Sequence, residues 1–114
     1  MGAYSLTYTE TAKRNITEIA GYISHKLNAP ESARKLVAKL MQAAAEVTAF
    51  PYAHTVHQTP QNEEPLKHEY RKILVDNYFV FYHVDETQSL VIVSAVIYAR
   101  RRLQAQLKQV EQVD

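Results

Sequence analysis

The sequence of 114 residues contains no cysteine and only two glycines, Gly2 and Gly21. Without cysteine the protein has neither disulfide bonds nor thiolate metal ligands, and we expect it in a reducing cytoplasm. Two glycines so far apart cannot form a glycine-rich phosphate-binding loop. No apolar run approaches the roughly 18 residues of a membrane span, and the first residues lack the pattern of a signal peptide. Because the formal net charge is only +1, any polyanion site must come from a local cluster of cations.

The second half of the chain has a strong β-strand pattern. Three apolar runs are rich in β-branched and aromatic residues, which favour strands over helices. They span residues 70–75, 78–85 and 90–98. The first connection consists of Asp76 and Asn77, two residue types that tolerate positive φ, and the second has about four residues. Since a parallel crossover needs roughly a dozen residues, we predict a three-stranded antiparallel meander. Its middle strand is apolar at nearly every position, which predicts cover on both faces.

The first half of the chain favours helices. Residues 4–9 alternate between apolar and polar side chains and predict a short strand, with Thr9 as the N-cap of the helix that follows. Apolar residues then recur at helical spacing in two segments, and Pro30 suits the first turn of the second, which should end near Ala49. The predicted buried stripe of this second helix consists of Ala33, Leu36, Val37, Leu40, Ala44 and Val47. The short link between the segments predicts an antiparallel helical hairpin.

The remaining segments complete the predicted fold. Residues 52–65 are polar, contain two prolines and show no periodicity, so we predict a loop. After the last strand, Leu103, Leu107 and Val110 have the spacing of a short amphipathic helix. We therefore predict one α+β domain over residues 1–114. It has an N-terminal strand, a helical hairpin packed on a mainly antiparallel sheet, and a short C-terminal helix.

The strongest chemical feature is a run of three arginines, Arg100, Arg101 and Arg102, directly after the last predicted strand. Guanidinium groups bind phosphates or carboxylates in bidentate fashion. Neighbouring side chains that leave a strand point in different directions, so the three cannot all share one partner. A solvated helix start is the alternative explanation, although three cations there oppose the helix dipole. Together with Lys72 on the first meander strand, these arginines are our candidates for binding a target or a phosphate.

If the chain is an enzyme, the candidate catalytic residues are Arg71, His83, Tyr98 and Arg101. Arg71 is alternatively part of a charged strand face. His83 could shuttle protons, or it could be a packed strand histidine. Tyr98 could stack on a base or donate a hydrogen bond, or it could simply pack. His54 and His57 are three residues apart, but with no cysteine nearby they do not predict a metal site. We expect neither a metal nor a cofactor.

Short motifs also occur along the chain in a fixed order. They are Tyr22-Ile23, Pro30-Glu31-Ser32-Ala33, Phe50-Pro51, Tyr70-Arg71-Lys72-Ile73-Leu74, Asn77-Tyr78-Phe79-Val80-Phe81-Tyr82 and Arg100-Arg101. In order and spacing, from Tyr4 to about Leu103, the chain resembles the RelE/ParE superfamily, the toxins of bacterial type II toxin–antitoxin modules. The resemblance implies a growth-inhibiting toxin of a plasmid stabilisation type of system. It also implies a cognate antitoxin whose extended or helical tail wraps this domain, in a toxin–antitoxin hetero-oligomer.

The superfamily divides by target. RelE-like mRNA interferases cut messenger RNA on the ribosome without a metal, whereas ParE-like toxins inhibit DNA gyrase. RelE-like nucleases carry an arginine directly after the tyrosine of the middle strand, but here Phe79 follows Tyr78. The helical hairpin and the end of the last strand are more similar to ParE. We therefore favour gyrase inhibition slightly over RNA cleavage. The alternatives are a metal-independent, ribosome-dependent endoribonuclease and an inactive relative that only pairs with its antitoxin.

Overall fold

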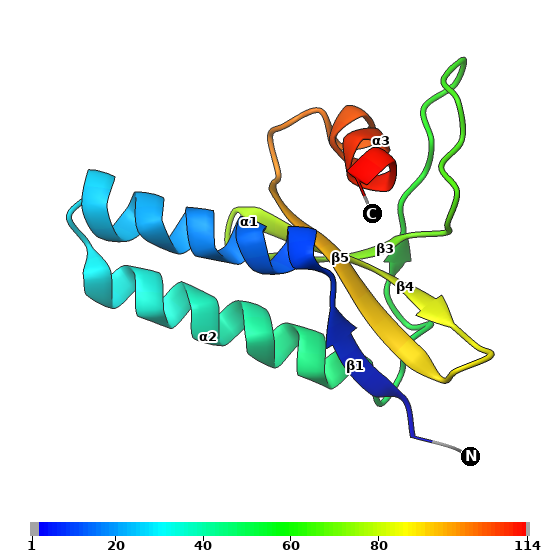
Figure 1. Ribbon diagram of the computed structural model, residues 1–114, viewed down its shortest axis with the longest axis horizontal. Helices are drawn as coiled ribbons and strands as arrows, with labels where there is room; N and C mark the ends of the chain where they lie inside the picture. Colours follow the sequence, from blue (N-terminus) through cyan, green and yellow to red (C-terminus); the bar gives the residue numbers. More distant parts are fainter. Residues whose placement is uncertain (1–2, 114) are drawn as a thin grey trace.

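The structure is a computed structural model that describes residues 3–113. In chain order its elements are β1 (Ser5–Tyr8), α1 (Glu10–Gly21), the π turn η1 (Tyr22–Lys26), α2 (Pro30–Val47), β2 (Thr55–Val56), β3 (Arg71–Val75), β4 (Tyr78–Asp85), β5 (Leu90–Tyr98) and α3 (Leu103–Val113). The α+β class, the helical hairpin and the short C-terminal helix agree with the prediction (Figure 1). None of the described helices is both long and apolar enough to cross a membrane.

The strands form one mixed sheet in the order β1-β5-β4-β3-β2. β3, β4 and β5 pair antiparallel in sequence order, so the predicted meander is confirmed. Asp76 opens the β3–β4 turn with a φ of 53°, in the left-handed region that aspartate tolerates. β1 pairs with β5, and this pairing is parallel. The last strand of the meander therefore lies inside the sheet, between the first strand of the chain and β4.

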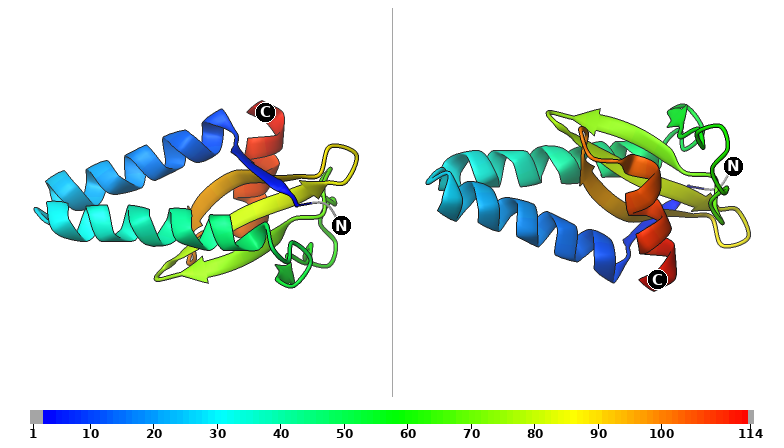
Figure 2. Two further views of the ribbon diagram at one scale, coloured as in Figure 1. Left: turned by 90° about the horizontal axis from the view of Figure 1, so that it is seen from below. Right: turned by 90° about the horizontal axis from the view of Figure 1, so that it is seen from above.

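Helices cover both faces of the sheet. In Figure 2, α2 lies in front of the sheet when it is seen from below, and α3 lies in front when it is seen from above. On the side of α1 and α2, the core includes Leu36, Leu40, Val80 and Tyr82. On the side of α3 it consists of Tyr70, Phe81, Ala95, Ile97, Leu107 and Val110. The predicted double cover of the middle strand is thus confirmed. The predicted stripe of α2 is buried except at Val37, which is half-buried.

Local capping explains where the helices begin. Thr9 is the N-cap of α1, since its hydroxyl oxygen accepts a hydrogen bond from the Ala12 N–H at 3.1 Å. Pro30 is the first residue of α2, where its missing N–H costs no hydrogen bond. Between the two helices, the Leu27 N–H donates to the Tyr22 carbonyl five residues back, at 3.2 Å. This π turn was not predicted, and it ends α1 with two large side chains, Tyr22 and Leu27, more than half exposed.

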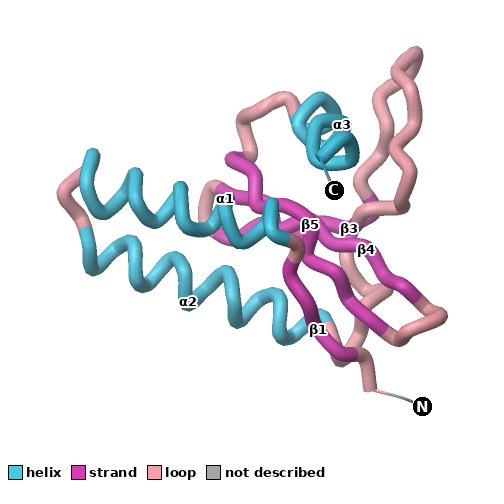
Figure 3. The backbone as a smooth tube through the Cα atoms, in the orientation of Figure 1, coloured by secondary structure: helices cyan, strands magenta, loops and turns pink. Residues whose placement is uncertain are grey.

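The long connection between α2 and β3 extends away from the sheet beside α3 (Figure 3). The sequence predicted only a loop here, but Thr55 and Val56 form the edge strand β2, which pairs with the start of β3. A strand of two residues is too short to show a period in the sequence. The loop is held to α3 by the buried Gln104, which bonds to the His57 ring at 2.8 Å and donates to the Glu64 carbonyl at 2.9 Å. The α2–β3 loop and α3 therefore pack as one unit.

Candidate functional site

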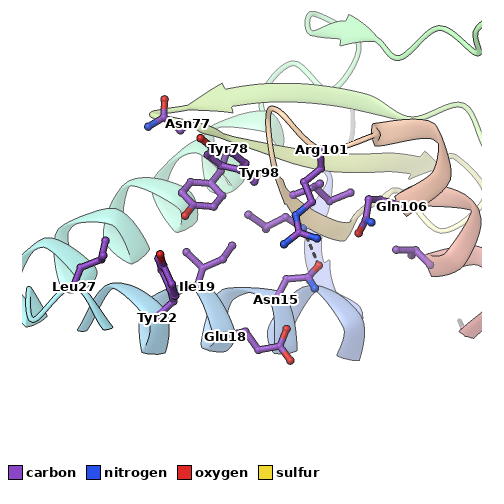
Figure 4. Close-up of a pocket in the computed structure, with 13 residues that line it drawn as sticks. Asn15, Glu18, Ile19, Tyr22, Leu27, Asn77, Tyr78, Tyr98, Arg101 and Gln106 are labelled. Carbon is purple, nitrogen blue, oxygen red and sulfur yellow. Dashed lines mark hydrogen bonds between the residues drawn. The ribbon is translucent and has the colours of Figure 1, made fainter. Parts of the chain in front are cut away.

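The second half of β5 borders an open groove. β1 pairs only with Leu90–Val93 of β5, so within residues 3–113 no strand lies beside residues 94–98 on that side. α1 flanks this edge instead, and the Asn15 side-chain oxygen accepts a hydrogen bond from the Val96 N–H at 3.0 Å. The groove has a volume of about 780 Å³. It is lined by Asn15, Glu18, Ile19, Tyr22, Leu27, Asn77, Tyr78, Val96, Ile97, Tyr98, Arg101, Gln106 and Val110 (Figure 4).

Three tyrosines lie along the groove. Tyr78 and Tyr98 meet edge to face, with ring centroids 5.7 Å apart and an interplanar angle of 63°. Tyr22 lies on the helical side, from the π turn. Burial raises the pKa of Tyr78, and the neighbouring phenols of Tyr98 and Tyr22 raise it further. The Tyr78 phenol therefore stays protonated at neutral pH and can donate a hydrogen bond. The groove thus offers apolar ring surface together with a hydroxyl donor.

The arginine run lies at the mouth of this groove. Arg101 lines it, with the guanidinium group directed toward α1 (Figure 4). Arg100 and Arg102 are exposed. Within the part of the chain that the structure describes, none of the three guanidinium groups forms an ion pair. Of the four candidate catalytic residues, only Tyr98 and Arg101 are brought together here.

Arg71 is engaged elsewhere. Its guanidinium donates to the Tyr52 carbonyl at 2.9 Å and to the His54 carbonyl at 2.8 Å, and it lies over the Tyr52 ring at 5.2 Å. It also pairs with Glu69 at 3.4 Å, and its side chain is only 16% exposed. Arg71 therefore fixes the turn after α2, with few donors left for a ligand. On β4, Arg71 pairs with Tyr82, whereas Tyr98 pairs with Tyr78. Four residues of β4 separate the two positions, so Arg71 and Tyr98 lie about 13 Å apart along the strands.

His83 occupies a different hollow. It stacks on His68 with ring centroids 3.9 Å apart, and the edge of Tyr70 is near. Burial, followed by the neighbouring His68, lowers the pKa of His83 to about 4, so its imidazole is neutral at pH 7. The hollow, of about 260 Å³, lies beside the last turns of α3. Glu111 of α3 closes it by accepting hydrogen bonds from the Lys67 and His68 N–H groups and the Tyr70 hydroxyl.

Lys72 lies apart from both hollows. Its ammonium is 5.0 Å from the ring centroid of Phe79, a cation–π distance. The two residues belong to neighbouring strands, and their side chains share the face of the sheet that carries α3. Lys72 does not line the groove that contains Arg101. Among residues 3–113, no group of three or more histidine, aspartate or glutamate side chains could hold a metal ion.

A second cluster of tyrosines closes the opposite end of the sheet. Tyr4 and Tyr52 both donate their hydroxyl hydrogens to the carboxylate of Glu86. The bond to Glu86 is the main cause that raises the pKa of Tyr52 to about 12, and the two hydroxyl donors lower the pKa of Glu86. This cluster joins the first strand, the β4–β5 turn and the turn after α2. Its tyrosines are therefore occupied, unlike those of the groove.

The groove residues that sequence reasoning missed include two of α1, Asn15 and Glu18. Both lie on α1 and carry no motif, so only the packing of α1 beside β5 shows that they face the groove. Tyr22 appeared only as part of a motif. The sequence signal for its role is the spacing of five residues between Tyr22 and Leu27. An α-helix would place these two side chains on different faces, whereas a π turn places them on the same face.

The chain matches the model of a known protein family. Residues 6–103 match the model of the family described as the ParE toxin of type II toxin-antitoxin system, parDE. Among curated proteins, no sequence matches this chain.

Solved structures share the fold at low sequence identity. The chromosomal ParDE toxin–antitoxin system from P. aeruginosa has a TM-score of 0.68 and 15% identity, over 86% of this chain and 98% of that chain. A mutant of the E. coli toxin RelE in the free state has a TM-score of 0.64 and 18% identity, over 99% of this chain and 100% of that chain. The toxin–antitoxin complex RelBE2 from Mycobacterium tuberculosis has a TM-score of 0.57 and 14% identity, over 85% and 99%.

Proposed function

Because this chain belongs to the ParE toxin family of type II toxin–antitoxin systems, we propose that it arrests growth by inhibiting DNA gyrase and that a cognate antitoxin neutralises it. The family match and the shared fold confirm the RelE/ParE superfamily that the sequence motifs indicated. The arrangement of the candidate catalytic residues bears on whether the target is gyrase or messenger RNA.

The observation that carries the gyrase proposal is the separation of the candidate catalytic residues. General acid–base chemistry on RNA needs a base, an acid and a cation within hydrogen-bond reach of one phosphate. Here Arg71 is bound to two carbonyls at one end of the sheet, and His83 lies in the hollow beside α3. Tyr98 and Arg101 line the groove at the other end. An arrangement so dispersed favours a toxin that works by binding over one that cleaves.

The groove supports the antitoxin part of the proposal. It combines exposed apolar surface from Tyr22 and Leu27 with the guanidinium of Arg101, which has no ion-pair partner among residues 3–113. An amphipathic tail can bury its apolar side chains against such a surface and place an acidic side chain on the arginine. The solved structures of ParDE and RelBE2 are toxin–antitoxin systems. We propose that the antitoxin tail of this system occupies the groove and so covers Tyr98 and Arg101.

The test of the target is a supercoiling assay with purified chain, gyrase and relaxed plasmid. We expect the chain to block supercoiling, and the cognate antitoxin, added in equal amount, to restore it. In cells, induction of the chain should cause DNA breaks within minutes while abundant transcripts remain intact by primer extension. Normal supercoiling in the presence of excess chain would contradict gyrase as the target.

RNA cleavage is the second candidate function, and one observation favours it. Tyr98 and Arg101 lie together at the groove, so an aromatic ring and a cation could hold one nucleotide. In the primer-extension experiment this function predicts discrete cuts within translated regions. Arg101→Ala should then abolish the cuts. An Arg34→Ala variant, altered on the exposed side of α2, is the matched control and should leave them unchanged.

A further inference from the structure

The net charge of +1 conceals two ends of the sheet with opposite charge. At the end where β5 stops, the connection to α3 carries Arg100, Arg101 and Arg102, which we call the basic tip. The only carboxylate of the adjacent β3–β4 turn is Asp76, and its oxygen lies 3.2 Å from the ammonium of Lys39. Asp76 therefore already pairs with a lysine of α2, and the turn supplies no further carboxylate to pair with the three arginines.

The opposite end of the sheet is acidic. Asp85 and Glu86 lie in and next to the β4–β5 turn, and Glu69 precedes β3. Among residues 3–113, the one ion pair that these three carboxylates form is that of Glu69 with Arg71. β5 has nine residues, so about 26 Å separates the two ends. A charge separation of this size orients the molecule in the field of a polyanion, with the basic tip foremost.

The basic tip is fixed in position and open to solvent. The Ala99 N–H donates to the Asn77 carbonyl at 2.8 Å, and the Arg101 N–H donates to the Tyr98 carbonyl at 3.0 Å. The backbone beneath the arginines is therefore held against the β3–β4 turn. All three arginine residues are exposed, and within residues 3–113 none of them has an ion-pair partner. Glu18 lines the same groove as Arg101 without pairing with it.

We propose that the basic tip binds the phosphate backbone of double-stranded DNA. Successive arginines diverge and cannot all reach one carboxylate, but a duplex presents phosphates on two strands at regular intervals, which suits several diverging guanidinium groups. The contact is independent of base sequence, since it reaches only phosphates. The inference deepens the proposed function and rests on it in naming DNA, the molecule on which gyrase acts. The toxin then holds the DNA through the tip while another surface contacts the enzyme.

The first experiment measures binding of the full chain to a 30-base-pair duplex by fluorescence anisotropy, between 50 and 200 mM salt. The variant is Arg100→Gln with Arg102→Gln. The control, Lys13→Gln with Arg34→Gln, removes the same charge from exposed positions of α1 and α2. Each phosphate contact contributes about 0.9 to the slope of log K against log salt. We expect the tip variant to reduce the slope by about 2 and to weaken binding at 50 mM salt about tenfold or more, while the control keeps the slope. Thermal denaturation confirms that both variants are folded.

Equal weakening by the two double variants, or no binding of the unaltered chain, would overturn the inference. The alternative partner of the basic tip is an acidic surface of gyrase, and it is tested by measuring how tightly the chain and the tip variant bind gyrase in the absence of DNA. Loss of that binding in the tip variant, with duplex binding unchanged, would assign the arginines to the protein and also overturn it. The supercoiling assay separates this inference from the proposed function. Inhibition without duplex binding rejects the inference alone, and duplex binding without inhibition rejects the gyrase target alone.

Discussion

The two ends of the sheet use the same kinds of side chain in opposite ways. At the end beside the β4–β5 turn, an arginine and two tyrosines have fixed partners, since Arg71 binds two carbonyls and both phenols bind Glu86. At the end where β5 stops, Tyr98 is 39% exposed and Arg101 has no ion pair among the described residues. The comparison teaches that residue type does not separate structural from functional side chains. The number of partners already present does.

The largest effect on stability should come from Arg71→Ala. It removes the guanidinium donor from the Tyr52 and His54 carbonyls at the end of the sheet. Hydrogen bonds from a charged donor are each worth about 1.5–3 kcal/mol, so we expect a loss of about 2–3 kcal/mol in the free energy of unfolding. Urea denaturation measures it. A loss below 0.5 kcal/mol would show that Arg71 is as free as Arg101, and the contrast between the two ends would disappear.

A smaller loss is expected for Asn15→Ala, at the groove. The substitution deletes the side-chain oxygen that accepts a hydrogen bond from the Val96 N–H, on the half of β5 that β1 does not reach. One such hydrogen bond contributes about 1 kcal/mol. Urea denaturation of Asn15→Ala beside Asn15→Asp separates the hydrogen bond from the shape of the side chain, because a carboxylate can still accept it. Equal losses in the two variants would indicate that packing of the side chain, and not the bond, supports the edge.

The Glu86 cluster predicts a dependence of stability on acid. The two phenol donors depress the pKa of Glu86 in the folded state, so its contribution to stability is present above the unfolded pKa near 4.5 and is lost as pH falls through the lower folded value. We therefore expect the melting temperature of the unaltered chain to fall on acidification more than that of Glu86→Gln. Differential scanning calorimetry at pH 7 and pH 3.5 measures both. An equal fall in the melting temperatures of the two proteins would mean that protonation of Glu86 does not contribute to the pH dependence of stability.

The smallest effect on stability should come from Arg101→Ala, which we expect to change the free energy of unfolding by less than about 0.5 kcal/mol. Its effect on toxicity should be large, because the same guanidinium is available to an antitoxin or a target. Growth after induction, compared with Arg34→Ala, measures that effect. Arg71→Ala and Arg101→Ala would then show opposite profiles, one unstable and one stable but inactive. Loss of stability in both would remove the distinction.

Much of the fold was predictable from local pattern. The meander follows from three β-type runs with short connections, and the helical hairpin follows from apolar spacing together with Thr9 and Pro30. What could not be predicted depends on contacts between distant segments. The parallel pairing of β1 with β5 joins residues more than 80 positions apart, and β2 is too short to show a period.

The candidate site was harder to predict than the fold. The sequence identified Tyr98 and the arginine run, but it grouped them with Arg71 and His83, which lie in other parts of the sheet. The partners that engage Arg71 are the Tyr52 and His54 carbonyls, backbone atoms that no residue pattern reveals. The groove itself depends on β1 being too short to cover all of β5. Site residues can thus be nominated from sequence, while their grouping requires the packed structure.

The place of β5 inside the sheet has a consequence for synthesis of the protein. Of the five strands in residues 3–113, β5 is the last to be synthesised, and both β1 and β4 pair with it. A nascent chain that ends before Leu90 has its helical hairpin but no site for β1 and no second partner for β4. We therefore expect such chains to stay incompletely folded and open to proteases. Translation that stops before β5 also yields no groove, because Val96, Ile97 and Tyr98 of β5 form part of its wall.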